Sequence, residues 1–465
     1  MAELRGNLVF LGLIQVFRLA AGVAVNVMIM QVLGVEGYGV YGYVLTLVGL
    51  LSFGANMGMS RYLQREIARA PERAGRLVTT GFVAALLLSL ITAGVIVTWA
   101  TLRDGRPEVV GAAALGSVAL GLQALVQPPV AWFNGTRRMK LALPGALFGR
   151  ILLVVGTAAA LWTDHGVMGV FAAQVVDALA GLAISAVIAL RGVEGPGTSV
   201  AEVRELVRSC LPFGLNALFG SIYLSVDVLV LQEVCGDREV GIYRGAVMLI
   251  SLFPIVADSF TTGIYPRMAL HLGDPERAGA ELRFVSRVLL ALSVPAAVGG
   301  LLVAEPLMVF IGGEPFSVSA LPFMVLAPML PLRFLNNGTA MTLSALDRQP
   351  DRTRGVFVAA LLNLAANLVV VPHYGAVGAA ATTLGTEVML TFWFRWHVRG
   401  LAVGVGLLDS LWRVALPALA MGAVVWLLDS WHVVLVVLCG ALVYGALALL
   451  TRGIQRADLR RLAKV

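Results

Sequence analysis

The sequence has few charged residues for its length. Asp, Glu, Lys and Arg make up 13% of its 465 residues, whereas soluble domains carry about 25%. Hydrophobic residues make up 59%, and the mean hydropathy is +0.88. This composition excludes an ordinary soluble protein and predicts an all-α, polytopic membrane protein. The net charge is +7, and the positively charged residues lie in short gaps between apolar segments. This distribution is typical of membrane topology and not of nucleic-acid binding.

The sequence also lacks the common catalytic and cofactor motifs. Its three cysteines (Cys210, Cys235 and Cys439) are widely separated, and its five histidines are scattered, so no metal-ligand spacing occurs. It has no Gly-x-x-x-x-Gly-Lys loop to hold ATP phosphates, and no nucleophile and base can be paired. We therefore expect no cofactor, no metal site and no enzymatic activity.

Long loops are lacking as well, because apolar segments follow one another closely. About fourteen segments approach the ~20 residues that span a bilayer as a helix. The loops between them are too short to form a domain outside the membrane. The segments lie near 8–33, 38–60, 78–101, 109–133, 144–162, 167–190, 210–233, 240–265, 288–311, 318–345, 355–372, 376–394, 413–428 and 433–451.

The basic residues indicate the orientation of these segments. If the N-terminus is cytoplasmic, the loops on the outer side hold only Arg103, Arg106 and Arg238, while the inner segments hold most other basic residues. Positively charged loops face the cytoplasm in membrane proteins. We therefore expect a multi-pass protein of the cell (inner) membrane with both termini in the cytoplasm.

The chain contains an internal repeat of six helices. An even number of spans returns the chain to its starting side, so the two copies have the same orientation. We expect lobes at 1–190 and 210–396, a cytoplasmic linker at 191–209, and helices 13 and 14 with a basic tail at 397–465. The repeat rests on three matches in the same order: 34–41 with 236–243, 71–75 with 275–279, and 166–169 with 375–378.

A polar stripe runs along the first apolar segment. Gln15, Arg18, Gly22 and Asn26 are spaced at three, four and four residues and share one helical face. Charged residues within a membrane face other helices or a water-filled cavity. Arg18 therefore either points into a lumen that receives an anion or pairs with a carboxylate on a neighbouring helix.

The repeat places a second polar stripe on the equivalent helix of the other lobe. This stripe ends at Asp227, and the same offset pairs Asn56 with Asp258. In a transporter built from two similar lobes, such stripes line the cleft between the lobes. The alternative is an Arg18–Asp227 ion pair that holds the lobes together. The other residues of the second stripe are Asn216, Gly220 and Tyr223.

Several stretches of the chain resemble the MOP superfamily of membrane exporters. They are the turn at 34–41, the arginine-rich loop at 61–76, the helix with Asn363 and Asn367, and the corner at 372–381 followed by Glu387. The superfamily includes MATE drug exporters, lipid II flippases and Wzx-type polysaccharide flippases. The compact loops and the Gly-x-Tyr turn most resemble the polysaccharide flippases, and the resemblance covers the whole chain, including the six, six and two helix plan.

This resemblance implies export of an oligosaccharide linked to polyprenyl diphosphate. The lipid-linked glycan would move from the cytoplasmic to the outer face by alternating access, as the two lobes rock against each other. The expected partners are this substrate, membrane lipids and no nucleic acid. Protons or sodium and polysaccharide-assembly proteins are further candidate partners.

The residues fit a diphosphate substrate. A diphosphate that crosses ~30 Å of hydrocarbon needs a hydrated, cationic path, and Arg is the side chain best suited to phosphate. Arg150, near the cytoplasmic end of its helix, either lines this path or reaches the membrane surface. The candidate residues for the cavity and its diphosphate are Arg18, Arg333, Asn26, Asn56 and Asn337.

Four carboxylates lie inside the predicted helices, namely Asp177, Asp227, Asp258 and Glu387. An exporter driven by an ion gradient could couple to protons or sodium through one of them. Alternatively, each carboxylate pairs with a neighbouring polar group or caps it.

Two other functions are alternatives. A MATE-like exporter of organic cations or other small molecules would have a lumen of carboxylate and aromatic groups, whereas this lumen carries at least two arginines. A membrane enzyme of glycan assembly would need a longer catalytic loop. A scaffold of glycan assembly that kept the fold without transport stays open.

Overall fold

The computed structural model describes residues 2–192, 195, 197–401, 404–428 and 431–451. The side chains of residues 2–15 and 401–411, and of several residues between 212 and 224, lie outside this description. Within the described part every regular element is a helix and no strand occurs, which confirms the predicted fold class. The chain forms two compact units, Met1–Ser225 and Val226–Val465, which we describe separately.

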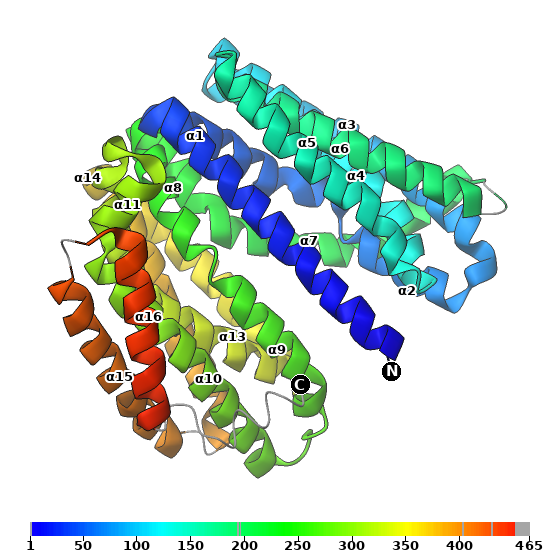
Figure 1. The fold of residues 1–465 in the computed structure, drawn as a ribbon. Coiled ribbons are helices and arrows are strands. Elements are labelled where there is room, and N and C mark those ends of the chain that lie inside the picture. Colours follow the sequence, from blue (N-terminus) through cyan, green and yellow to red (C-terminus); the bar gives the residue numbers. More distant parts are fainter. Residues whose placement is uncertain (1, 193–194, 196, 402–403, 429–430, 452–465) are drawn as a thin grey trace. The chain divides into compact units, whose positions relative to one another are not determined.

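The first unit consists of long helices joined by short turns (Figure 1). The helix α7 begins in this unit, and the boundary between the units falls within it. The predicted lobe boundaries stay a prediction. The elements are α1 (Ala2–Asn56), α2 (Met59–Arg69), η1 (Pro71–Arg73), α3 (Ala74–Arg103), α4 (Pro107–Gly135), η2 (Met139–Ala142), α5 (Leu143–Trp162), α6 (Gly166–Gly192) and α7 (Val200–Cys235).

The helix α1 is a hairpin of two helical arms. Gly34 breaks it with a φ of 65° and a ψ of −166°, a conformation that favours glycine. The Tyr38 hydroxyl donates a hydrogen bond of 2.8 Å to Asn26 Oδ1 across this break. Twelve residues of straight helix would separate the two backbones by ~18 Å, so the chain must fold back. The predicted spans 8–33 and 38–60 are therefore the two arms.

Helix α6 contacts both α4 and α5, and α1 contacts α3, α4 and α5. The core of this unit includes Tyr41 and Phe171, whose rings lie 5.5 Å apart. Outside the apolar spans, α2 is amphipathic. Its residues Met59, Leu63 and Ile67 repeat every four positions and are buried. The arginine-rich loop expected after the second span is therefore partly helical.

The second unit holds the rest of α7 and the remaining helices (Figure 1). Its elements are α8 (Asp237–Ile250), α9 (Pro254–Ala269), α10 (Pro275–Leu302), α11 (Ala304–Gly312), η3 (Glu314–Ser319), α12 (Ala320–Leu326), α13 (Met329–Ala345), α14 (Gln349–Val398), η4 (Arg399–Leu401), α15 (Gly404–Leu427) and α16 (Val433–Leu450).

Three segments that were expected as continuous helices are broken in this unit. The segment 240–265 is divided into α8 and α9, 288–311 into α10 and α11, and 318–345 into α12 and α13, which are bent by 48°. A proline lies at or just after each break: Pro254, Pro306 and Pro328. Proline has no backbone N–H to donate and its ring clashes with the preceding turn, which accounts for the breaks.

Helix α14 is a second hairpin, broken at Gly375 with a φ of 51° and a ψ of −134°. The Asn363 side-chain amide donates to Thr386 Oγ1 at 3.1 Å across the hairpin. This contact confirms the predicted spans 355–372 and 376–394 as two separate arms. Helices α15 and α16 pack on α10, and the Tyr444 hydroxyl donates to the Ala291 carbonyl at 2.7 Å.

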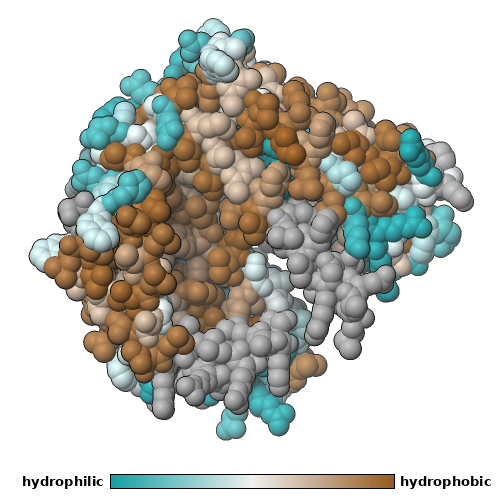
Figure 2. Space-filling model, in the orientation of Figure 1, coloured by the Kyte–Doolittle hydropathy of each residue, from teal (hydrophilic) through white to brown (hydrophobic). Residues whose placement is uncertain are grey.

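The outward surface of both units is apolar. Leu90 and Ile91 on α3 are 63% and 66% exposed, and Val369 on α14 is 68% exposed. Figure 2 shows hydrophobic side chains over much of the visible face and hydrophilic ones mainly toward its margins. Within the described residues, nine helices are long and apolar enough to cross a membrane, or ten with the bent pair α12–α13. Two of the nine contain the hairpins α1 and α14, so the protein is a polytopic all-α membrane protein.

Candidate functional site

Two arginines and an aspartate meet inside the first unit. Arg150 on α5 forms an ion pair with Asp177 on α6, with Nη1 3.4 Å from Oδ2. Arg18 on α1 is exposed and interacts electrostatically with both residues. The absence of a side chain at Gly149 leaves room for the Asp177 carboxylate, because a Cβ added at Gly149 would lie 2.5 Å from Asp177 Oδ1. The cluster therefore carries one more positive than negative charge.

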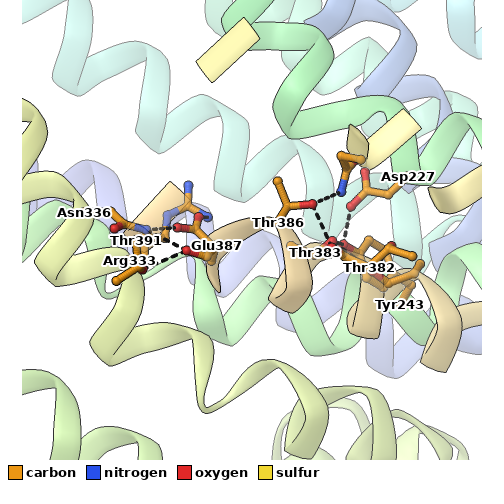
Figure 3. A network of polar contacts seen from close by, with 11 residues as sticks. Asp227, Tyr243, Arg333, Asn336, Thr382, Thr383, Thr386, Glu387 and Thr391 are labelled. Carbon is orange, nitrogen blue, oxygen red and sulfur yellow. Dashed lines mark hydrogen bonds and ion pairs between the residues drawn. The ribbon is translucent and has the colours of Figure 1, made fainter. Parts of the chain in front are cut away.

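The second unit contains a comparable pair. Arg333 on α13 lies with Nη1 3.9 Å from Oε1 of Glu387 on α14. The Asn336 amide donates to Glu387 Oε2 at 2.8 Å and to the Glu387 backbone carbonyl at 3.1 Å. Figure 3 shows Arg333, Asn336 and Glu387 grouped together, with Thr391 beside them. The structure thus places Arg333, which was predicted to bind diphosphate, beside Glu387, which was predicted either to couple ions or to pair with a neighbouring group.

A third group brings together two predicted residues that lie far apart in the sequence. The Asn337 amide on α13 donates to Asp258 on α9. Thr261 donates to the amide oxygen of Asn337 at 3.2 Å. Arg352 interacts electrostatically with Asp258 and donates to Ser344 Oγ at 3.0 Å. Asp258 itself is exposed, unlike the three other interior carboxylates.

Asp227 is fully engaged within the second unit. Its carboxylate accepts from the Tyr243 hydroxyl and, at 2.9 Å, from the Val228 backbone N–H. The Tyr243 hydroxyl also lies 3.2 Å from Thr383 Oγ1. Figure 3 shows Asp227 and Tyr243 near Thr383, which lies on the second arm of α14. The proposed Arg18–Asp227 pair would join residues of different units, and it stays a prediction.

The remaining predicted residues have different surroundings. Asn26 uses its amide within α1, because it donates to the Gly22 carbonyl at 2.8 Å and accepts from Tyr38. Asn56 ends α1 and is partly buried, and its side chain forms no hydrogen bond with another described residue. The side chains of Gln15 and Asn216 lie outside the described part of the chain.

We did not predict from the sequence that Tyr243 donates a hydrogen bond to Asp227 or that Arg352 interacts with Asp258. The repeat already paired Tyr41 with Tyr243, so a polar role for a tyrosine at this position could have been inferred. No such signal distinguishes Arg352 from Arg348 and Arg354 in the same basic stretch. Across the described residues, no three His, Cys, Asp or Glu side chains gather as a metal site would require.

A pocket of about 460 Å³ lies in the first unit where α2, η1 and α3 meet the start of α7. One contact holds the start of α7 there, with Arg76 Nε 3.7 Å from Glu202 Oε1. A second holds the chain just before α7, where the Thr80 and Thr198 hydroxyls lie 2.8 Å apart. Hydrogen bonds from the Ser199 side chain and backbone lower the pKa of Glu202. The charged and aromatic lining residues are Tyr62, Glu66, Arg73, Arg76, Glu202 and Glu205, so charges of both signs face this pocket.

Comparisons with known proteins agree with this fold. A probable flippase, AglR, from Haloferax volcanii is 25% identical over 334 residues, covering 67% of each chain. The lipid II flippase MurJ in an inward closed conformation has a TM-score of 0.77 at 14% identity, over 97% of this chain and 99% of that chain. An inward-facing multidrug resistance MATE family transporter of the MOP superfamily has a TM-score of 0.68 at 16% identity, over 83% of this chain and 96% of that one.

These structural likenesses show that the chain has the same fold as these transporters. The sequence profile of the family described as polysaccharide biosynthesis protein matches residues 4–270, which is more than half of the chain. The chain belongs to this polysaccharide biosynthesis protein family.

Proposed function

We propose that this protein is a flippase for an oligosaccharide linked to polyprenyl diphosphate. It moves the lipid-linked glycan from the cytoplasmic to the outer face of the cell membrane by alternating access, with both termini in the cytoplasm. It performs no enzymatic step, and proteins of polysaccharide assembly are its candidate partners. The family match and the flippase AglR support glycan transport.

One observation carries the choice of a diphosphate. Arg18, Arg150 and Arg333 all lie on membrane-spanning helices and all remain partly or fully exposed. A charged side chain in a membrane faces a water-filled cavity or another protein group and not lipid. Guanidinium groups hold phosphate oxygens in pairs. An interior with accessible arginines therefore suits an anionic headgroup.

The contacts of the interior carboxylates disfavour a MATE-like exporter of organic cations. Such a lumen needs several carboxylates that are free to attract a cation, whereas three of the four interior carboxylates here are engaged by protein groups and only Asp258 is exposed. Here Arg150 neutralises Asp177, and Arg333 neutralises Glu387. Tyr243 and a backbone N–H hold Asp227.

The first test measures the sidedness of lipid-linked glycan in a strain that lacks this protein. We expect the glycan to accumulate on the cytoplasmic face and wild-type protein to relieve the accumulation. Arg18→Ala should fail to relieve it at normal membrane levels, because a phosphate contact is lost. The matched control is Arg61→Ala, an exposed arginine of α2 outside the apolar spans, which should behave as wild type. Rescue by Arg18→Ala, or its absence from the membrane, would remove the support for its cavity role.

We further propose that Asp258 couples transport to a proton or sodium gradient. It is the exposed one of the four interior carboxylates, it accepts a hydrogen bond from Asn337, and Arg352 interacts with it electrostatically. Asp258→Asn should keep the side-chain shape and remove the charge. We expect export by this variant to lose its dependence on an imposed ion gradient. Unchanged dependence across both a pH series and a sodium series would exclude this role.

A further inference from the structure

Each unit holds an arginine against a carboxylate at a similar depth along an equivalent helix. Asp177 lies about three helical turns after Gly166, where α6 begins, and Glu387 lies about three turns after Gly375, where the second arm of α14 begins. These two glycines occupy matching positions in the repeat. Their arginines come from different helices, α5 in one unit and α13 in the other. The paired charges therefore recur even though the arginine positions do not.

The exposure of the two pairs is also alike. The Arg150 side chain is 27% exposed and its partner Asp177 is 12% exposed. The Arg333 side chain is 29% exposed and its partner Glu387 is 3% exposed. In both units the carboxylate is the deeper partner. A ligand that reached either pair from solvent would meet the guanidinium first.

Both pairs are loose. Their closest N–O separations are 3.4 and 3.9 Å, beyond the 2.7–2.9 Å or so of a charge-assisted hydrogen bond. By comparison, the pair of Arg267 and Glu281 in the second unit closes to 3.0 Å. A guanidinium has five N–H donors. Among the described residues, neither Arg150 nor Arg333 donates a hydrogen bond that meets normal geometry, so their donors stay available for an acceptor.

We propose that Asp177 and Glu387 are positioning residues that hold Arg150 and Arg333 as counter-ions until a phosphate replaces the carboxylate. This inference rests on the proposed diphosphate substrate. The exchange makes and breaks no covalent bond, because one anion replaces another beside the guanidinium. Each carboxylate keeps another favourable partner after the exchange. Arg18 remains near Asp177, and the Asn336 amide remains bonded to Glu387. When the phosphate leaves, the carboxylate recovers its arginine and promotes release.

The test uses the full-length protein in detergent and farnesyl diphosphate as the probe. Asp177→Asn and Glu387→Gln remove the competing charge and keep the side-chain shape. We expect each to bind the probe about fivefold more tightly or better, the change expected for one charge ~4 Å away in a well-hydrated site. In transport, the half-saturating concentration and the maximal rate should both fall, because release slows. Glu281→Gln, which breaks a closer carboxylate–arginine pair near the N-terminal end of α10, should leave affinity unchanged.

A second set of variants distinguishes this role from simple stabilisation, even where a single variant folds poorly. Arg150→Gln should weaken binding, and the double variant Arg150→Gln/Asp177→Asn should bind as weakly as Arg150→Gln. If the pair only stabilises the fold, the double variant would instead bind like wild type, and the inference is wrong. Affinity that is unchanged or lower in both Asp177→Asn and Glu387→Gln also overturns it. Wild-type protein that does not bind the probe would contradict the proposed function as well.

Discussion

At the scale of single residues, Asp227 illustrates how a carboxylate can be kept in the interior of the long helix α7. It is 7% exposed, and burying a charge is costly unless hydrogen bonds satisfy it. The Tyr243 hydroxyl and the Val228 N–H supply those bonds. Tyr243 is itself buried and joins α7, α8 and the second arm of α14 through Asp227 and Thr383.

We expect Tyr243→Phe to destabilise the protein by about 1–3 kcal/mol, the cost of leaving a buried polar group without one of its partners. The apparent midpoint of thermal unfolding in detergent should fall. The matched control is Tyr374→Phe, which removes the same hydroxyl from a side chain that is 68% exposed. Its midpoint should equal that of wild type. If both variants unfold at the wild-type temperature, the bond to Asp227 contributes nothing to stability.

The sequence identified the interior residues of the candidate site but not their partners. Arg18, Asp177, Arg333 and Glu387 are recognisable because a charge within an apolar segment is rare. The pairing of Arg150 with Asp177 could not be predicted, because it depends on how α5 and α6 are rotated against each other. The Asn337–Asp258 contact joins helices whose packing is likewise set by the tertiary fold.

At the scale of secondary-structure elements, the two hairpins are the features that turn the chain most sharply. Both break at a glycine with positive φ, Gly34 in α1 and Gly375 in α14. At the second break the Ala376 backbone N–H donates to Glu239 Oε2 at 2.8 Å. The first turn of α8 thus holds the corner of α14 within the second unit.

We expect Gly375→Ala to lower the stability of the protein. A residue with a Cβ at this φ and ψ costs about 1–3 kcal/mol in backbone strain, and the new methyl group would collide with the Glu239 carboxylate. Membrane levels and the unfolding midpoint should both fall. Gly385→Ala lies in the same arm, where nothing is within 4 Å of an added Cβ, and it should be tolerated. Equal behaviour of the two variants would show that the corner carries no strain.

The hairpins were predictable from the sequence, whereas the internal breaks were not. The gaps at 34–37 and 373–375 were expected, because they separate the predicted segments 8–33 from 38–60 and 355–372 from 376–394. Pro254, Pro306 and Pro328 lie at or near breaks in α8–α9, α10–α11 and α12–α13, yet Pro128, Pro129 and Pro295 lie inside continuous helices. Membrane helices tolerate proline where neighbouring groups satisfy the backbone, so proline alone does not locate a break.

At the scale of the whole molecule, the repeat and the charge pairs suggest one design for both units. Each unit has an apolar outer surface and at least one arginine held loosely by a carboxylate. The sequence predicted the membrane class and most of the helices, because composition and hydropathy carry these signals. It predicted the family through a resemblance in short motifs, such as the turn at 34–41 and the corner at 372–381. The identity of the sugar leaves no comparable signal, because the chain–substrate contacts proposed here involve the diphosphate.

The most direct test of the central claim measures movement of a labelled polyprenyl-diphosphate oligosaccharide across vesicles that contain the purified protein. We expect wild-type protein to move the lipid across the bilayer much faster than empty vesicles do. Arg18→Ala should slow this movement about tenfold or more, as expected for the loss of a hydrogen bond to a charged group, while Arg61→Ala keeps the wild-type rate. Equal rates in empty and wild-type vesicles would contradict the flippase function, and a wild-type rate for Arg18→Ala would contradict the cationic path.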